Sequence, residues 1–234
     1  MRPCFPASAA PLLAMLLAAA ALTGCGSSTQ GNGVAAKTPT EILAGAKVLA
    51  DAAKSVHVAG TIHSASSPIT LDLSLLAGKG GRGVLSESGL SFELIQIHGT
   101  VFIKGSPAFF THIAGPSAAQ LLQGRWLKAS AASGGLAALA SLTDLGGLVN
   151  TALAAHGPLT KGAITTVDGQ KAIAVMDPST GGSLYVATTG PPYPIKITMG
   201  GAGAGSITFD QWNQPVLVFA PANSIDINAL RSGH

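Results

Sequence analysis

The sequence has 234 residues, of which 47% are hydrophobic and only 10% are charged, with a formal net charge of +3. This composition argues against nucleic-acid binding, because the few basic residues are scattered and supply no concentrated positive charge to neutralise phosphates. The length suits one domain, or at most two small ones, and we expect one.

The amino terminus has the pattern of a cleavable lipoprotein signal peptide, which we place at residues 1–24. Arg2 supplies a short positive region, residues 12–22 form an apolar stretch too short to span a bilayer, and the motif LTGC at 22–25 places a cysteine at the cleavage point. The alternative is a buried cysteine in an apolar helix, but the polar residues 26–30 argue against it. The motif therefore predicts lipid attachment at Cys25.

Lipidation at Cys25 predicts that the protein is anchored to the cell membrane on its extracytoplasmic face. Two acyl chains anchor stably, because each buried methylene contributes about 0.8 kcal/mol, and no transmembrane helix is then required. Cys4, the only other cysteine, would leave with the signal peptide, so no disulfide is expected. Residues 25–37 are small and polar and predict a flexible tether to a single domain at 38–234.

The first element expected after the tether is a helix over residues 39–54. Thr38 can cap it, Pro39 suits its first turn, and Glu41 occupies the acidic position of a capping box. Five strands are then predicted from alternating apolar residues, separated by glycine-containing turns such as Ser88-Gly89 and His98-Gly99. Their ranges are 56–62, 69–75, 83–87, 90–97 and 100–104.

The middle of the chain predicts helices rich in small residues. Ser106-Pro107 opens a helix that Gly115-Pro116 interrupts, and residues 124–128 form a short extended segment. Two further helices, at 133–145 and 148–155, are expected to hinge at Gly146-Gly147. Strands then resume at 162–167, 171–176, 183–189, 194–199 and 206–212.

This order of elements predicts an α+β fold, because the helices lie at the start and in the middle of the chain instead of after every strand. About ten antiparallel strands form a twisted sheet that should curl. We therefore expect a large curved antiparallel β-sheet, or half-barrel, with helices packed on its concave face. Such a face can enclose a ligand cavity.

No catalytic, cofactor or metal site is predicted. The chain has no Gly-x-Ser-x-Gly, His-Glu-x-x-His or Cys-x-x-Cys motif, so an envelope hydrolase would need groups that only folding brings together. His57 and His63 share one strand face without an evident acidic partner and are interpreted as solvent-facing. Asp72 and Asp210 are interpreted as solvated side chains, and the glycine run 201–205 as a hairpin turn.

The chain resembles the LppX/LprA/LprF/LprG family of mycobacterial-type lipoproteins, whose fold is similar to that of the LolA and LolB carriers. The likeness covers roughly residues 38–230. It rests on five segments: 101–105 (VFIKG), 109–110 (FF), 124–128 (GRWLK), 184–194 (LYVATTGPPYP) and 207–216 (ITFDQWNQPV). The resemblance implies a hydrophobic cavity that binds acylated lipid or lipoglycan and carries or presents it in the cell envelope. It also implies a monomer without enzymatic activity, with an envelope transporter as a further partner.

The apolar residues of the middle helices and the first strands are the candidate lining of this cavity, although each is equally compatible with ordinary core packing. Glycine and alanine between the helical leucines leave a wide concave sheet underfilled, which favours a cavity. The alternative function is an interaction module that assists another envelope protein, for which a filled core and an exposed apolar patch are expected. The candidate lining residues are Leu71, Leu73, Phe92, Leu94, Leu121, Leu122, Leu136, Leu139, Leu142, Leu148 and Leu153.

Overall fold

The computed structural model describes residues 31–63, 67–133, 136–154, 157–201 and 204–232. The expected signal peptide, Cys25 and the first half of the tether lie outside the described residues. The sheet, the helices and the core described below are all contained between Gly31 and Ser232. A chain that begins at Gly31 therefore keeps every described element.

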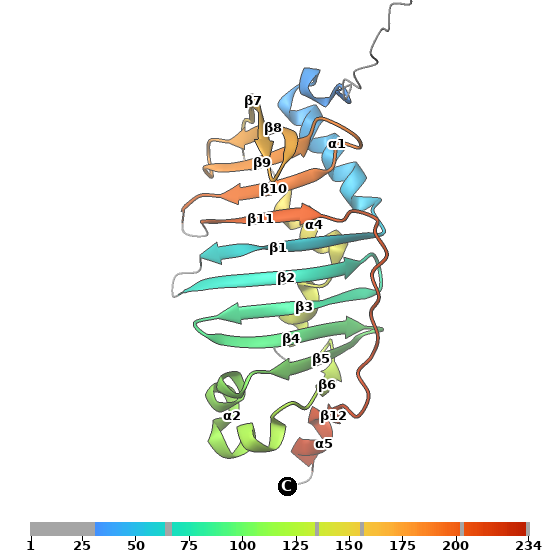
Figure 1. The fold of residues 1–234 in the computed structure, drawn as a ribbon, viewed down its shortest axis with the longest axis vertical. Helices are drawn as coiled ribbons and strands as arrows, with labels where there is room; N and C mark the ends of the chain where they lie inside the picture. The colour runs from blue at the N-terminus through green and yellow to red at the C-terminus, as the bar shows by residue number, and fades with distance from the viewer. Residues whose placement is uncertain (1–30, 64–66, 134–135, 155–156, 202–203, 233–234) are drawn as a thin grey trace, which may run out of the picture.

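A single open sheet of twelve strands dominates the described residues, and its curvature confirms the predicted α+β half-barrel (Figure 1). All neighbours are antiparallel except β12 and β6, which are parallel. The spatial order is β12-β6-β5-β4-β3-β2-β1-β11-β10-β9-β8-β7. The strands are β1 (Ser55–His63), β2 (Pro68–Leu76), β3 (Gly80–Glu87), β4 (Leu90–Ile97), β5 (Thr100–Gly105), β6 (Leu127–Ser130), β7 (Thr160–Val167), β8 (Gln170–Asp177), β9 (Gly182–Ala187), β10 (Pro194–Met199), β11 (Gly205–Asp210) and β12 (Ile225–Asp226).

Near the middle of the open sheet, β1 pairs with β11, a strand from near the other end of the chain. His57 lies opposite Asp210 and Gly60 opposite Ile207 in this pairing. Only glycine fits at position 60, because a Cβ there would lie 2.1 Å from the carbonyl oxygen of Ser206. The pairing joins the first meander, β1–β5, to the second, β7–β11, in one continuous surface (Figure 1).

Helix α1 (Pro39–Asp51) begins as predicted. The Thr38 hydroxyl accepts a hydrogen bond from the Glu41 N–H, and the Glu41 carboxylate accepts one from the Thr38 N–H at 2.9 Å, which completes the capping box. Ile42, Ala46 and Ala50 are buried along one face of the helix. Because these residues recur at helical spacing, they share one face of α1, and this face packs against β8, β9 and α4 (Leu145–Ala152).

Helix α2 (Pro107–Leu122) lies at the far end of the sheet, against β4 and β5 (Figure 1). Gly115 has φ of 83° and precedes Pro116, so the predicted interruption of this helix is confirmed. Phe110, Ala119 and Leu127 form a small separate core there, against which the final helix α5 (Ile227–Ser232) also packs.

The predicted hinge at Gly146-Gly147 is wrong. Helix α3 is Leu136–Ser141, and a non-helical segment separates it from α4. Both glycines lie in the first turn of α4. The break falls at Asp144, whose backbone is extended, with φ of −87° and ψ of 101°. A Cβ on Gly147 would lie 2.6 Å from the Asp144 carboxylate, so the glycine makes room for that side chain instead of acting as a hinge.

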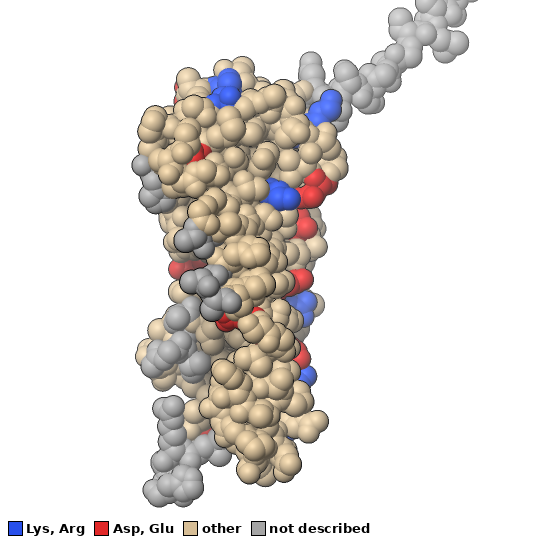
Figure 2. Space-filling view, turned by 90° about the vertical axis from the view of Figure 1, so that its left-hand side faces the viewer, with Lys and Arg blue, Asp and Glu red and all other residues tan. Residues whose placement is uncertain are grey.

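Polar and apolar side chains separate onto the two faces of the sheet. Along β2, Leu71, Leu73 and Leu75 are buried, while Asp72 is exposed. The buried side chains face α4, which lies behind the sheet in Figure 1. Figure 2 shows the edge of the molecule, with most charged side chains in a column along the outer face of the sheet. The concave face therefore supplies the apolar environment in which a ligand site can form.

Candidate functional site

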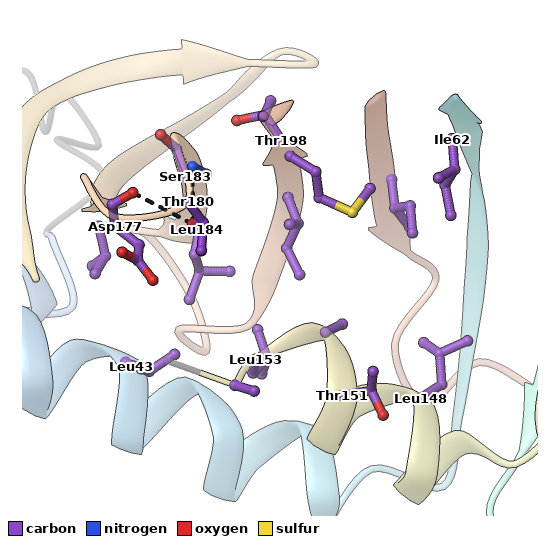
Figure 3. A pocket seen from close by; sticks show the side chains of 18 of the residues that line it. Leu43, Ile62, Leu148, Thr151, Leu153, Asp177, Thr180, Ser183, Leu184 and Thr198 are labelled. Atoms are coloured by element: carbon purple, nitrogen blue, oxygen red, sulfur yellow. Dashed lines mark hydrogen bonds between the residues drawn. The ribbon is translucent and has the colours of Figure 1, made fainter. Parts of the chain in front are cut away.

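A cavity of about 680 Å³ lies between the concave face of the sheet and the helices α1 and α4 (Figure 3). It extends under β1, β2 and β8–β11, around the junction of the two meanders. Its size falls within the range of pockets that hold small-molecule ligands. The cavity is half-enclosed, so that a ligand can reach solvent at one side.

Apolar side chains form most of the cavity wall. Strand alternation directs them inward from the sheet, and helical spacing directs a second set upward from α4. The sheet contributes Ile62, Leu71, Val175, Leu184, Ile197, Met199 and Ile207. The helices and their connections contribute Leu43, Leu142, Leu148, Ala152, Leu153 and Leu159. Ala152 and Gly147 fill little space, which is why the concave face is not packed solid here.

Polar side chains gather at one end of the cavity, where β8 ends and β9 begins (Figure 3). The Asp177 carboxylate accepts a hydrogen bond from the Ser179 N–H at 2.9 Å and a short one from the Ser179 hydroxyl. The Thr180 hydroxyl accepts a hydrogen bond from the Gly182 N–H at 3.3 Å. The cavity therefore combines a long apolar wall with one end that carries the Asp177 carboxylate and the Thr180 hydroxyl.

Four of the candidate lining residues lie at the cavity wall: Leu71, Leu142, Leu148 and Leu153. Leu73 and Leu94 are instead fully buried in the packed core, and Leu139 and Phe92 pack against that core. Leu122 packs in the small core of α2. Leu121 is 78% exposed, and the side chain of Leu136 lies outside the described part of the chain.

The cavity lies under β1, β2 and β8–β11, whereas the candidate sheet residues were chosen from β2 and β4 alone. The concave space beneath β3–β5 is filled, in part because the Phe92 and Phe109 rings pack with centroids 5.0 Å apart. Leu184, Ile197 and Ile207 were missed, although each alternates with outward-facing residues in a strand predicted from the sequence. That alternation places them on one face but does not say that α4 crosses beneath them.

Comparisons with known proteins agree on the fold. No family model and no curated protein sequence matches the chain. Among solved structures, LprF from Mycobacterium bovis is similar with a TM-score of 0.52 and 16% identity, covering 79% of this chain and 97% of LprF. The Mycobacterium tuberculosis lipoprotein LppX is similar with a TM-score of 0.50 and 18% identity, covering 77% of this chain and 99% of LppX.

This chain has the LppX/LprF-type fold. The structural likeness covers nearly the whole of both solved proteins. No helix among the described residues is long and apolar enough to cross a membrane. The described residues also contain no group of three or more His, Cys, Asp or Glu side chains that could hold a metal ion.

On the outer face of this LppX/LprF-type sheet, the structure brings together three residues that sequence analysis left apart. The His57 Nδ1 lies 2.7 Å from an Asp210 carboxylate oxygen, and its Nε2 lies 3.1 Å from one of Asp72. Asp210 is the direct cross-strand partner of His57, and Asp72 is its diagonal neighbour on β2. His57 thus lies on the outer face of the sheet, as predicted, but the expectation that it has no acidic partner is wrong.

This cluster makes the protein's stability depend on pH. Partial burial lowers the pKa of His57, but the hydrogen bonds and charges of Asp72 and Asp210 together outweigh it and raise the pKa above the ordinary 6.5. Both contacts are satisfied only by the doubly protonated ring, because a neutral ring has one N–H. The stabilisation is therefore complete below about pH 6.5 and is lost as the pH rises through the raised value.

We expect the free energy of unfolding to fall between pH 6 and 8 more steeply in the native protein than in the variant His57→Gln. Urea unfolding at several pH values measures this difference. The control is His63→Gln, at the exposed end of the same strand, which should retain the native slope. Parallel slopes for the native protein and His57→Gln would show that the cluster does not bind a proton more tightly in the folded state.

Proposed function

We propose that this protein is a lipoprotein anchored to the extracytoplasmic face of the cell membrane, which binds acyl lipid or lipoglycan in the cavity and carries or presents it in the cell envelope. The observation that carries the proposal is the apolar cavity beneath β1, β2 and β8–β11. The LTGC motif ending at Cys25 supports the anchoring, and the likeness to the lipoprotein LppX supports the class of protein.

The energetics of acyl binding agree with a cavity of this size. Burying about ten methylene groups contributes about 8 kcal/mol, before the cost of immobilising the chain. The apolar wall supplies this burial without a hydrogen-bond partner for each ligand atom, so binding of this kind requires no cofactor. Release would require only an acceptor that buries the same methylenes.

Native mass spectrometry with lipid extraction tests the proposal. A chain that begins at Gly31 should be purified from a related host and measured without detergent. Co-purified or added acyl lipid bound at one copy per chain is the expected result. A ligand-free mass across several preparations, with no uptake of offered lipids, would contradict lipid binding and favour the interaction module.

An exposed apolar segment supports that second candidate function. Leu217 and Phe219 are 65% and 71% exposed on the extended segment 211–224, which runs past the strand ends toward β12 (Figure 1). Two exposed side chains of this size can contact another envelope protein.

The anchoring part of the proposal has its own test. The mass of the full chain purified from membranes should correspond to a protein that begins at Cys25 and carries at least two acyl groups. Cys25→Ser should remove the acyl groups and release the protein from the membrane. An unmodified amino terminus at Met1 would contradict this part of the proposal while leaving lipid binding in the cavity unaffected.

A further inference from the structure

The amino-terminal segment is fixed to the sheet from Asn32 onward. The Asn32 N–H donates a hydrogen bond to the Thr188 carbonyl at 2.8 Å. Its side-chain amide donates two more, to the carbonyls of Ala187 and Gly190, at 2.9 and 2.8 Å. Val34 is buried in the main core. These contacts attach the start of the described chain to the end of β9, in the half of the sheet that lies away from α2 (Figure 1).

The distance from Cys25 to this attachment point is short. Asn32 follows Cys25 by seven residues, which span about 25 Å when fully extended. By comparison, β6 lies eight strand spacings from β9, or about 38 Å at about 4.8 Å each. A lipid on Cys25 would therefore hold the β7–β9 end of the sheet near the bilayer and leave the α2 end farther away.

A cleft of about 640 Å³ lies at this same end of the molecule, between residues 31–36 and the paired strands β7 and β8. Among the described residues, Lys171 is the one charged side chain that lines it. Lys171 lies directly across from Thr166 on β7, so the ammonium and the hydroxyl project from the same face of the sheet. Ile164 projects from that face as well and is 55% exposed. The cleft thus presents a cation, a hydroxyl and an apolar side chain together.

Lys171 has no ionic partner in the described part of the chain. Its exposed ammonium takes part in none of the three ion pairs found there. Two further cations border the same segment. The Lys161 ammonium donates hydrogen bonds to the carbonyls of Ala35 and Lys37, at 3.0 and 2.9 Å, and the side chain of Lys37 is exposed.

Two carboxylates belong to the same end of the molecule, and neither lines the cleft. The Glu41 carboxylate accepts hydrogen bonds from the N–H and the hydroxyl of Thr38, and Asp168 lies in the exposed turn between β7 and β8. The cleft therefore keeps its own positive charge. A phosphate accepts hydrogen bonds from ammonium and hydroxyl groups alike, and a lysine near an anionic membrane surface favours contact about fivefold.

We propose that this cleft docks anionic phospholipid headgroups of the bilayer that carries the lipidated Cys25, with Lys171 as the principal contact. The inference rests on the proposed anchoring and adds an orientation to it. Leu184 lines the cavity three residues before β9 ends at Ala187, so the cavity begins about 10 Å from the attachment point. Docking therefore brings the cavity close to the membrane and shortens the path of an acyl chain that leaves the bilayer.

Methyl relaxation in nanodiscs tests the docking. Residues 25–234 should be attached through Cys25, their only thiol, to a maleimide lipid. The nanodiscs hold a gadolinium-chelating lipid in phosphatidylcholine, with or without phosphatidylglycerol. Ile164 at the cleft and Ile113 on α2 are matched reporters, because they are 55% and 56% exposed. We expect stronger relaxation enhancement at Ile164 than at Ile113, and phosphatidylglycerol should raise the enhancement at Ile164 about twofold or more.

Lys171→Gln should remove most of that increase, whereas Lys171→Arg should retain it because the charge remains. The control Lys79→Gln removes a charge from the exposed turn between β2 and β3 and should leave the increase unchanged. An enhancement at Ile164 that does not respond to phosphatidylglycerol, or that responds equally in Lys171→Gln, would overturn the docking. Because the attachment is made chemically, this outcome is distinct from a lack of acyl groups on Cys25 in the protein purified from membranes.

Discussion

Replacing Ala152 with Trp is expected to weaken acyl-lipid binding at least tenfold while the protein stays folded. Ala152 lies at the end of α4, is partly buried and lines the cavity, so an indole ring there occupies space that an acyl chain would fill. Losing the burial of two or more methylenes, at about 0.8 kcal/mol each, accounts for a tenfold change. Displacement of a fluorescent fatty acid measures the effect.

The matched control is Ala44→Trp, which adds the same ring to the exposed side of α1. Its affinity for the fatty acid should equal that of the native protein, and both variants should give native circular dichroism spectra. Undiminished binding by a folded Ala152→Trp variant would mean that the ligand site lies elsewhere on the molecule.

Replacing Leu73 with Ala is expected to destabilise the protein by about 2–5 kcal/mol. Leu73 is completely buried at the centre of the packed core, so its truncation leaves a new cavity among side chains that cannot close around it. Leu148 is only partly buried and already borders the existing cavity. Leu148→Ala should therefore lower the free energy of unfolding by less than half as much as Leu73→Ala does.

Urea unfolding of the two variants, compared with the native protein, measures this difference. The comparison separates two roles that the sequence alone cannot distinguish, since both residues are leucines on the concave side of the structure. Equal destabilisation by Leu73→Ala and Leu148→Ala would show that the space around Leu148 is packed as tightly as the core.

Local patterns in the sequence were enough to predict most of the secondary structure. The alternation in residues 69–75 predicts β2, and the turns Ser88-Gly89 and His98-Gly99 adopt the positive φ angles, between 50° and 78°, that two-residue hairpins require. The capping residues of α1 also behave as predicted. These features depend on neighbours in the chain, which is why they can be read from it.

Features that depend on contacts distant in sequence could not be predicted. Asp72 and Asp210 are 15 and 153 residues from His57, and only the pairing of β1 with both β2 and β11 brings them to its ring. Likewise, Leu71 and Leu73 lie on the same face of one strand and are both buried in the core, yet only Leu71 also lines the cavity, which no local pattern distinguishes.

The central claim is that acyl chains occupy the cavity beneath β1, β2 and β8–β11. Nuclear Overhauser effects between the methylenes of a bound ¹³C-labelled fatty acid and the protein's methyl groups test it most directly. We predict contacts to Leu148, Leu184 and Ile197, and none to Leu73 or Leu94. Contacts confined to the exposed side chains of Leu217 and Phe219 would contradict the claim and assign the lipid to the outer surface.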